Sequence, residues 1–200
     1  MNLTNKKIRI AVQKRGRLQE PSLKFLETLG LKIRKNGSKL IAACSNADVE
    51  ILFVRNSDIP QYVKYGVADY GILGENVLVE KRCKLKILQR LGFGKCSLVI
   101  AVPRKSKIKS VKDLSEERIA TSYTNTLKKF LKEKGVNASM IEIKGSVEIC
   151  PSLNMSDAIC DITQTGSALK ENDLRIVEEI MNSEAVLVES PFSKLLTKSE

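Results

Sequence analysis

The chain has 200 residues, of which 42% are hydrophobic but only 4% aromatic, and its formal net charge is +11 at pH 7. This length allows one large domain or two small lobes and is sufficient to bury a sizeable core. The sequence contains no histidine, which excludes nucleophilic catalysis by a Cys–His pair.

Membrane insertion and export are not expected from this sequence. No apolar run approaches the ~20 residues that span a bilayer, and the first residues lack the pattern of a secretory signal. The five cysteines are scattered and include no CxxC pair, which argues against a disulfide framework or a zinc site. Cys96 and Cys160 lie in apolar runs and are predicted to be core residues. We therefore expect a cytoplasmic protein with no metal site built from its own side chains.

The positive charge either attracts an anionic partner or keeps the protein soluble. Lysines gather at residues 104–112 and 128–134, which we interpret as solvated loop and helix faces. Nucleic acid is an alternative partner, but few aromatic residues are available to stack on bases and no nucleic-acid-binding module is visible. Small polyanionic substrates explain the charge at least as well.

Strands and helices alternate along the chain. In the first half, strands are predicted at residues 7–12, 49–54 and 68–74, with a hairpin over 31–44 that turns at Asn36-Gly37. Helices are predicted from Pro21 to Gly30 and from Asp58 to Gly66.

In the second half, strand-like runs occur at residues 85–102 (two runs around Gly92-Phe-Gly94), 118–122, 140–143, 157–162, 176–181 and 185–188. A helix begins at Thr124 or Asn125 and ends at Gly135, and a second helix is predicted at 168–172. The alternation predicts an α/β fold with mainly parallel sheets.

Cationic side chains follow two of the predicted strands. Lys14, Arg15 and Arg17 occupy the turn after the first strand, and Arg55 directly follows the buried strand 49–54. The carboxyl ends of parallel strands form the edge of an open α/β sheet where ligands bind. Charged residues are also common in surface turns that bind nothing, so this signal alone is weak.

The most informative stretch is the loop Thr163-Gln164-Thr165-Gly166-Ser167, which follows a short buried strand and precedes a helix. Such a loop can offer several backbone N–H groups to a phosphate monoester. Asp157 and Asp161 lie just upstream, and carboxylates in this setting suit ribose hydroxyls or a Mg²⁺ that bridges to phosphate. The alternative is a purely structural turn, because Thr and Ser often cap helices without any ligand.

Several stretches together resemble one family, the short form of ATP phosphoribosyltransferase. The residues that carry the resemblance are IRIAVQKRGRL (8–18), FVRNSDIPQYVKYGVADYGILGENVL (53–78), LGFGKCSLVIAVP (91–103) and GSVEICPSLNMSDAICDITQTGSALKENDL (145–174). They cover nearly the whole chain, in the order and spacing of the family.

The resemblance implies a two-lobed α/β fold similar to type II periplasmic binding proteins, with mixed, mostly parallel sheets and the active site in the interlobe cleft. One lobe would comprise residues 1–90 and 175–200, and the other residues 91–174. The implied reaction transfers the 5-phosphoribosyl group of phosphoribosyl pyrophosphate (PRPP) to N1 of ATP and releases pyrophosphate, with Mg²⁺ as cofactor. This is the first step of histidine biosynthesis.

The resemblance also implies roles for single residues. The loop Thr163–Ser167 would hold the 5′-phosphate of PRPP, and Asp157 or Asp161 would accept the ribose hydroxyls. Lys14, Arg17 and Arg55 would bind pyrophosphate and the ATP phosphates. Glu148 would help to hold the ribose or the adenine.

Short-form members have no room for the regulatory domain of the long forms. The resemblance therefore implies a hetero-oligomer with a regulatory subunit similar to histidyl-tRNA synthetase, with the catalytic chains paired as a homodimer. The alternative from another functional class is a non-catalytic anion-binding module of the periplasmic-binding-protein type, against which the missing export signal counts.

Overall fold

The computed structural model describes residues 7–34 and 40–193, and the chain divides into two compact units. Unit 1 comprises residues 1–94 and 184–200, and unit 2 comprises residues 95–183. The sequence placed these divisions at 90/91 and 174/175. The second division lies later because the strand Leu174–Ser183 pairs along its length with the strand Cys96–Pro103 of unit 2.

Unit 1 is built on a six-stranded sheet in the order β2-β3-β1-β4-β11-β5. The strands β1 (Ile8–Gln13), β3 (Val49–Val54) and β4 (Tyr70–Gly74) are parallel. Antiparallel strands complete the sheet on both sides: β2 (Ile41–Ala43), β11 (Ala185–Glu189) and β5 (Lys86–Arg90).

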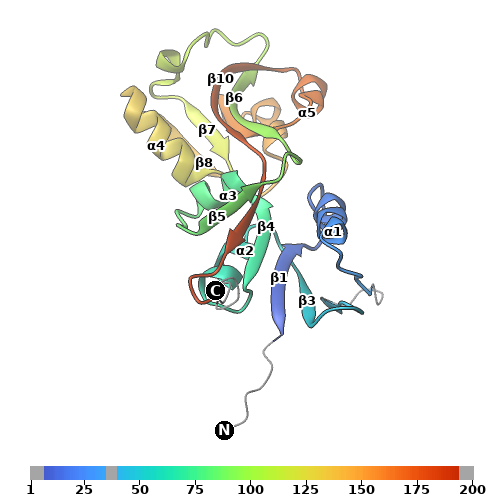
Figure 1. The fold of residues 1–200 in the computed structure, drawn as a ribbon. Coiled ribbons are helices and arrows are strands. Elements are labelled where there is room, and N and C mark those ends of the chain that lie inside the picture. Colours follow the sequence, from blue (N-terminus) through green and yellow to red (C-terminus); the bar gives the residue numbers. More distant parts are fainter. Residues whose placement is uncertain (1–6, 35–39, 194–200) are drawn as a thin grey trace. The chain divides into compact units, whose positions relative to one another are not determined.

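Side chains of β1 alternate between the two faces of this sheet, as a pleated strand requires. Ile10 and Val12 join a core cluster with Leu23 and Leu26 of helix α1 (Gln19–Thr28). Ala11 joins the cluster on the other face, where helices α2 (Ile59–Lys64) and α3 (Glu75–Glu80) pack. Figure 1 shows α1 and α2 beside β1 and β4 in this unit.

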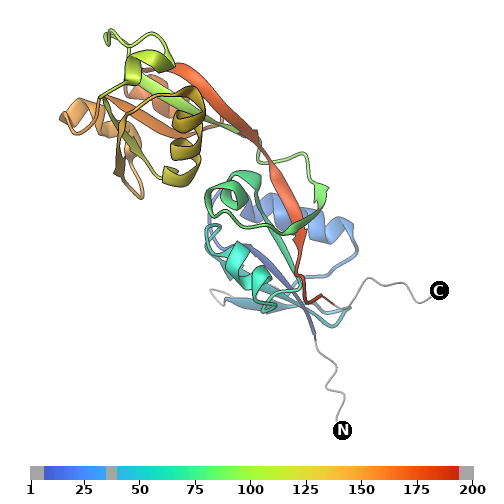
Figure 2. The ribbon, with the colours of Figure 1, turned by 90° about the vertical axis from the view of Figure 1, so that its left-hand side faces the viewer.

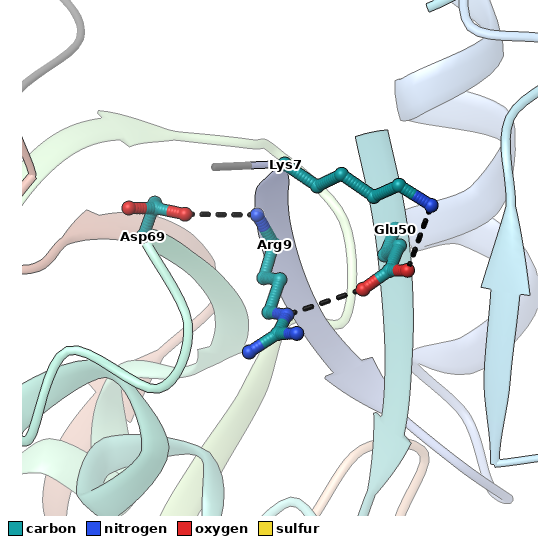
Figure 3. A network of polar contacts seen from close by, with 4 residues as sticks. All are labelled: Lys7, Arg9, Glu50 and Asp69. Carbon is teal, nitrogen blue, oxygen red and sulfur yellow. Dashed lines mark hydrogen bonds and ion pairs between the residues drawn. The ribbon is translucent and has the colours of Figure 1, made fainter. Parts of the chain in front are cut away.

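A polar network joins the amino-terminal ends of the central strands (Figure 3). Lys7 and Arg9 both form ion pairs with Glu50 of the neighbouring strand β3, at 3.2 and 3.1 Å. The backbone N–H of Arg9 donates to Asp69 at 2.9 Å, and the Asp69 N–H donates to the carbonyl of Arg9 at 2.8 Å. Arg9 and Lys7 hold the pKa of Glu50 below its ordinary value. These residues fix the strand register at the end of the sheet opposite to the basic turn.

Unit 2 contains a five-stranded sheet in the order β10-β6-β9-β7-β8. Its strands are β6 (Cys96–Pro103), β7 (Arg118–Thr121), β8 (Ser139–Glu142), β9 (Ala158–Thr163) and β10 (Leu174–Ser183). The strand β10 runs antiparallel to β6, and Figure 2 shows the two side by side. The helices are α4 (Thr124–Lys134), α5 (Ser167–Glu171) and the 3₁₀ turns η1 (Val111–Leu114), η2 (Val147–Ile149) and η3 (Pro151–Leu153).

Each face of the second sheet is covered by a different group of helices. Leu127, Phe130 and Leu131 of α4 pack on the face that carries Cys160 of β9. On the other face, Val147 of η2 and Leu169 of α5 pack against Ile159 of the same strand. The helix α4 ends at Gly135, whose φ of +67° is the left-handed conformation of a glycine C-cap.

The α/β class and the mixed sheets are confirmed, but "mostly parallel" was wrong. Among the paired strands of the described residues, five pairings are antiparallel and four are parallel. The predicted Asn36-Gly37 turn lies outside the described residues, although an antiparallel bridge joins Ile33 and Cys44 on either side of it. Cys96 and Cys160 are buried, as predicted. In the described part of the chain, no helix has both the length and the apolar character needed to cross a bilayer.

Candidate anion-binding sites

The carboxyl ends of β1 and β3 carry a cationic pocket in unit 1. The two parallel strands end in register, with Gln13 opposite Val54, so the segments that follow them emerge together. A pocket of about 380 Å³ lies there, lined by Gln13, Lys14, Arg15, Arg55 and Asn56. The structure thus brings together Lys14 and Arg55, which the sequence placed on the ligand-binding edge of a sheet.

The basic turn is held by backbone and side-chain bonds. The Lys14 N–H donates to the carbonyl of Val54 at 2.7 Å, and the Leu18 N–H donates to Oε1 of Gln13 at 3.1 Å. Gly16 supplies a φ of +111°, which a side chain would disfavour. The Leu18 side chain is only 1% exposed. The residues between these anchors are therefore preorganised, and Lys14 and Arg15 enter the pocket wall from a fixed backbone.

The electrostatics of this pocket favour an anion with several charges. Three cations and no carboxylate line it, and none of the three forms an ion pair within the described residues. Unit 1 contains 20 Lys and Arg residues against 11 Asp and Glu, whereas unit 2 contains 14 against 12. Unit 1 thus carries +9 of the net charge of +11. Such a concentration of positive charge attracts phosphates.

The sequence predicted Arg17 as a binding residue, but the pocket is lined by Arg15 instead. Arg17 is half-buried and is not among the pocket residues, whereas its neighbour Arg15 is exposed and is one of them. Gln13 and Asn56 were also missed, because neutral amides carry no sequence signal of their own. The Oδ1 atom of Asn56 is buried without a hydrogen-bond partner in the described residues, which marks a polar wall beside the cations.

The predicted phosphate loop lies in unit 2, between β9 and α5. The Gly166 N–H donates to Oγ1 of Thr163 at 3.1 Å, and the Ser167 N–H lies 3.4 Å from Oγ1 of Thr165. Thr165 and Ser167 also bond through their hydroxyls at 3.1 Å. Gln164, Thr165 and Ser167 are exposed, and Gly166 has a φ of +76°. Two of the loop's N–H groups, those of Gly166 and Ser167, therefore bond to hydroxyls of the loop that an incoming phosphate can replace.

Asp161 lies near this loop on a covered face of the sheet. Because side chains alternate along β9, Ile159, Asp161 and Thr163 share one face. The turn η2, which contains the half-buried Glu148, packs on that same face through Val147. Oδ1 of Asp161 accepts the N–H of Ile162 at 2.8 Å. Asp161, Glu148 and the loop thus belong to elements on one side of the sheet of unit 2.

Asp157 is placed elsewhere and has a structural partner. It precedes β9, whereas the loop follows it, so about 20 Å of strand separates Asp157 from Thr163. Oδ2 of Asp157 accepts a hydrogen bond from Nε of Arg118 and Oδ1 accepts one from Nη2, each at 2.9 Å. Oδ2 also accepts a hydrogen bond from the backbone N–H of Arg118 at 3.0 Å. These bonds hold the pKa of Asp157 below its ordinary value. The structure therefore does not bring Asp157 to the predicted phosphate loop, whereas Asp161 lies on the face of β9 that leads into it.

Known proteins of similar sequence share one description. The family model HisG, described as ATP phosphoribosyltransferase, matches residues 55–199. The chain is 46% identical over 184 residues to the ATP phosphoribosyltransferase of Cytophaga hutchinsonii, covering 92% of this chain and 64% of the relative. It is 40% identical over 188 residues to that of Maricaulis maris, covering 91% and 64%. The chain thus spans less than two thirds of the length of these curated relatives.

Solved structures agree with this relationship. The structure described as "ATP phosphoribosyl transferase (HisG:HisZ) complex from Thermotoga maritima" matches with a TM-score of 0.81 and 34% identity, over 93% of this chain and 89% of that one. A substrate-binding protein of an amino acid ABC transporter matches with a TM-score of 0.57 and 17% identity, which shows the fold alone. It confirms the two-lobed α/β class similar to periplasmic binding proteins. By the family model and by these relatives, the chain belongs to the HisG family of ATP phosphoribosyltransferases.

Proposed function

We propose that the chain transfers the 5-phosphoribosyl group of PRPP to N1 of ATP and releases pyrophosphate, the first step of histidine biosynthesis. The observation that carries this proposal is the pocket of Lys14, Arg15 and Arg55 at the carboxyl ends of β1 and β3, in a chain of the HisG family. Both substrates and the leaving group are polyphosphates, the ligand class that this pocket suits.

The chemistry of the reaction fits the side chains available. Displacement of pyrophosphate passes through an oxocarbenium-like state in which the leaving group gains negative charge, so fixed cations stabilise it. Adenine N1 already has a lone pair, and the reaction depends on alignment of the reactants more than on a strong base. A chain without histidine is therefore equipped for this step.

The proposed roles follow the geometry. Lys14, Arg15 and Arg55 bind the ATP phosphates and the departing pyrophosphate, and Arg17 stays a candidate from the family resemblance. The loop Thr163–Ser167 binds the 5′-phosphate through backbone N–H groups and hydroxyls. Asp161 accepts hydrogen bonds from the ribose hydroxyls, and Glu148 helps to hold the ribose or the adenine.

Mg²⁺ is part of the proposal as a companion of the substrate phosphates. Mg²⁺ is commonly held by one or two carboxylates together with phosphate oxygens, and Asp161 offers one such carboxylate beside the loop. Among the described residues, no group of three or more Cys, Asp or Glu side chains is arranged to hold a metal ion. The ion would neutralise charge on the pyrophosphate while Asp161 orients the ribose.

The proposed partner is a regulatory subunit of the HisZ type, similar to histidyl-tRNA synthetase, in a hetero-oligomer that contains a homodimer of this chain. The support is the Thermotoga maritima neighbour, which is described as a HisG:HisZ complex. We propose the cytoplasm as the location, since ATP and PRPP are made there.

A turnover assay with omission controls tests the function. Purified protein is incubated with ATP, PRPP and Mg²⁺, with and without a HisZ-type subunit, and released pyrophosphate is measured. We expect release only when both substrates are present. Binding of PRPP and ATP without release, in both preparations, would instead support the anion-binding module. Binding of RNA with a steep salt dependence, and of neither substrate, would support the nucleic-acid alternative.

A further inference from the structure

Gln13 occupies a central position in the cationic pocket. It is the last residue of β1, it is half-buried, and it lines the pocket beside Lys14 and Arg55. Its Oε1 accepts the N–H of Leu18, across the turn that contains Lys14 and Arg15. The side chain thus spans the basic turn from one end to the other.

The hydrogen bond to Leu18 also fixes which end of the amide is which. A backbone N–H can donate only to the oxygen of a carboxamide, so Nε2 must occupy the opposite position. That nitrogen lies over Gly16, where a Cβ atom would be only 2.6 Å away. In residues 7–34 and 40–193 the structure shows no hydrogen-bond acceptor for Nε2. A donor is therefore held in the pocket wall with its bonding capacity unused.

We propose that Gln13 binds the ligand directly, with Nε2 donating to a phosphate oxygen while Oε1 holds the turn that carries Lys14 and Arg15. The inference rests on the proposed function, which supplies a polyphosphate for this pocket. A phosphate oxygen only accepts hydrogen bonds, so a fixed neutral donor among three cations suits it. The same donor would not suit a cationic ligand.

Gln13→Glu separates the two roles of the side chain. The carboxylate keeps an oxygen acceptor for the Leu18 N–H, so the turn keeps its brace, but the Nε2 donor is replaced by a negative charge. Gln13→Ala removes both the brace and the donor. Asn56→Asp places the same charge in the same pocket without changing Gln13. Gln61→Glu adds that charge to an exposed position of α2, outside the pocket lining.

The experiment titrates inorganic pyrophosphate into each full-length protein by calorimetry, at low and at high salt. We expect Gln13→Glu to weaken binding by about tenfold or more at low salt, since a hydrogen bond to a charged group is lost and a repulsive charge is added. At high salt the loss for Asn56→Asp should shrink, since screening weakens the added repulsion, whereas a loss of about fivefold should persist for Gln13→Glu, which also lacks the donor. Gln61→Glu should bind within twofold of wild type.

Melting temperatures provide the check on folding. Gln13→Glu should melt close to wild type, and Gln13→Ala should melt lower and bind more weakly. The inference is overturned if Gln13→Glu binds within twofold of wild type, or if it matches Asn56→Asp at both salt concentrations. It is also overturned if the wild type binds no pyrophosphate. Failure of the proposed function would appear separately, as normal pyrophosphate binding without turnover of ATP and PRPP.

Discussion

Asp157 and Asp161 lie four positions apart in the sequence, and the structure gives them different surroundings. Asp157, which precedes β9, forms a bidentate ion pair with Arg118. Asp161 lies within β9, on the face that also carries Thr163 and the covering turn η2. Their residue type and position in the sequence motif made them equal candidates for ribose binding, and only the strand geometry separates them.

The ion pair predicts a pH-dependent stability. Asp157→Asn should lower the free energy of unfolding by about 1 kcal/mol at pH 7, because a partly exposed charge pair is lost. The Arg118 pair lowers the pKa of Asp157 in the folded state. Its stabilisation is therefore present above the ordinary pKa of about 3.9 and is lost as the pH falls through the lower folded value.

Urea unfolding at pH 7 and at pH 3 measures this difference. The wild type and Asp157→Asn should differ at pH 7 and approach each other at pH 3. Asp161→Asn is the matched comparison, which should lose activity while keeping most of its stability. The reverse pattern, with Asp157→Asn inactive but equally stable, would return the ribose role to Asp157.

Arg55 should be sensitive to even a conservative change. Arg55→Ala should lower kcat/KM by about tenfold to a hundredfold, the range expected for hydrogen bonds to charged groups. Arg55→Lys should recover only part of this loss, since lysine cannot bind phosphate with a planar fork. Steady-state kinetics with both substrates measures the effect. Arg34→Ala, an exposed arginine of the same unit, should retain wild-type kinetics; equal losses in Arg34 and Arg55 variants would refute the assignment.

At the scale of the elements, sequence patterns located most strands and helices. The runs at 49–54 and 118–122 became β3 and β7, and the helix expected to stop at Gly135 does so. Helix α3 was missed because Glu75–Glu80 directly follows the buried strand β4 and reads as its continuation. Antiparallel pairing of β6 with β9 and β10 was also missed, because an apolar run reveals burial but not strand direction.

The site could be predicted only in part for a related reason. Strand–turn patterns located the basic turn, Arg55 and the phosphate loop, since each follows a recognisable apolar run. They favoured Arg17, whereas Arg15 lines the pocket; the turn conformation that involves Gly16 and the Gln13–Leu18 bond is not visible in an apolar pattern.

Packing of α2 on β4 depends on a glycine. A Cβ atom on Gly71 would lie 2.7 Å from Ile59 and 2.8 Å from Val63, both in α2. Gly71→Ala should therefore lower the free energy of unfolding by about 1–3 kcal/mol through overpacking. Thermal or urea unfolding checks this. Gly145→Ala is the control, since a Cβ there meets nothing within 4 Å; equal effects of the two substitutions would contradict the packing argument.

At the scale of the whole molecule, the net charge is concentrated in unit 1, which carries the cationic pocket. We expect kcat/KM for ATP to fall by about tenfold between low and high salt, because screening weakens the attraction of the anionic substrate. The melting temperature over the same range serves as the control. A kcat/KM independent of salt would show that this charge does not steer the substrate.

The most direct test of the central claim is identification of the product. ATP, PRPP and Mg²⁺ are incubated with the protein, alone and with a HisZ-type subunit, and the nucleotide product is analysed by mass spectrometry and NMR. Phosphoribosyl transfer predicts one adduct of ATP with the ribosyl C1 attached to N1 and one pyrophosphate released per adduct. Unchanged ATP and PRPP in both preparations, from a folded protein that binds them, would contradict the assignment.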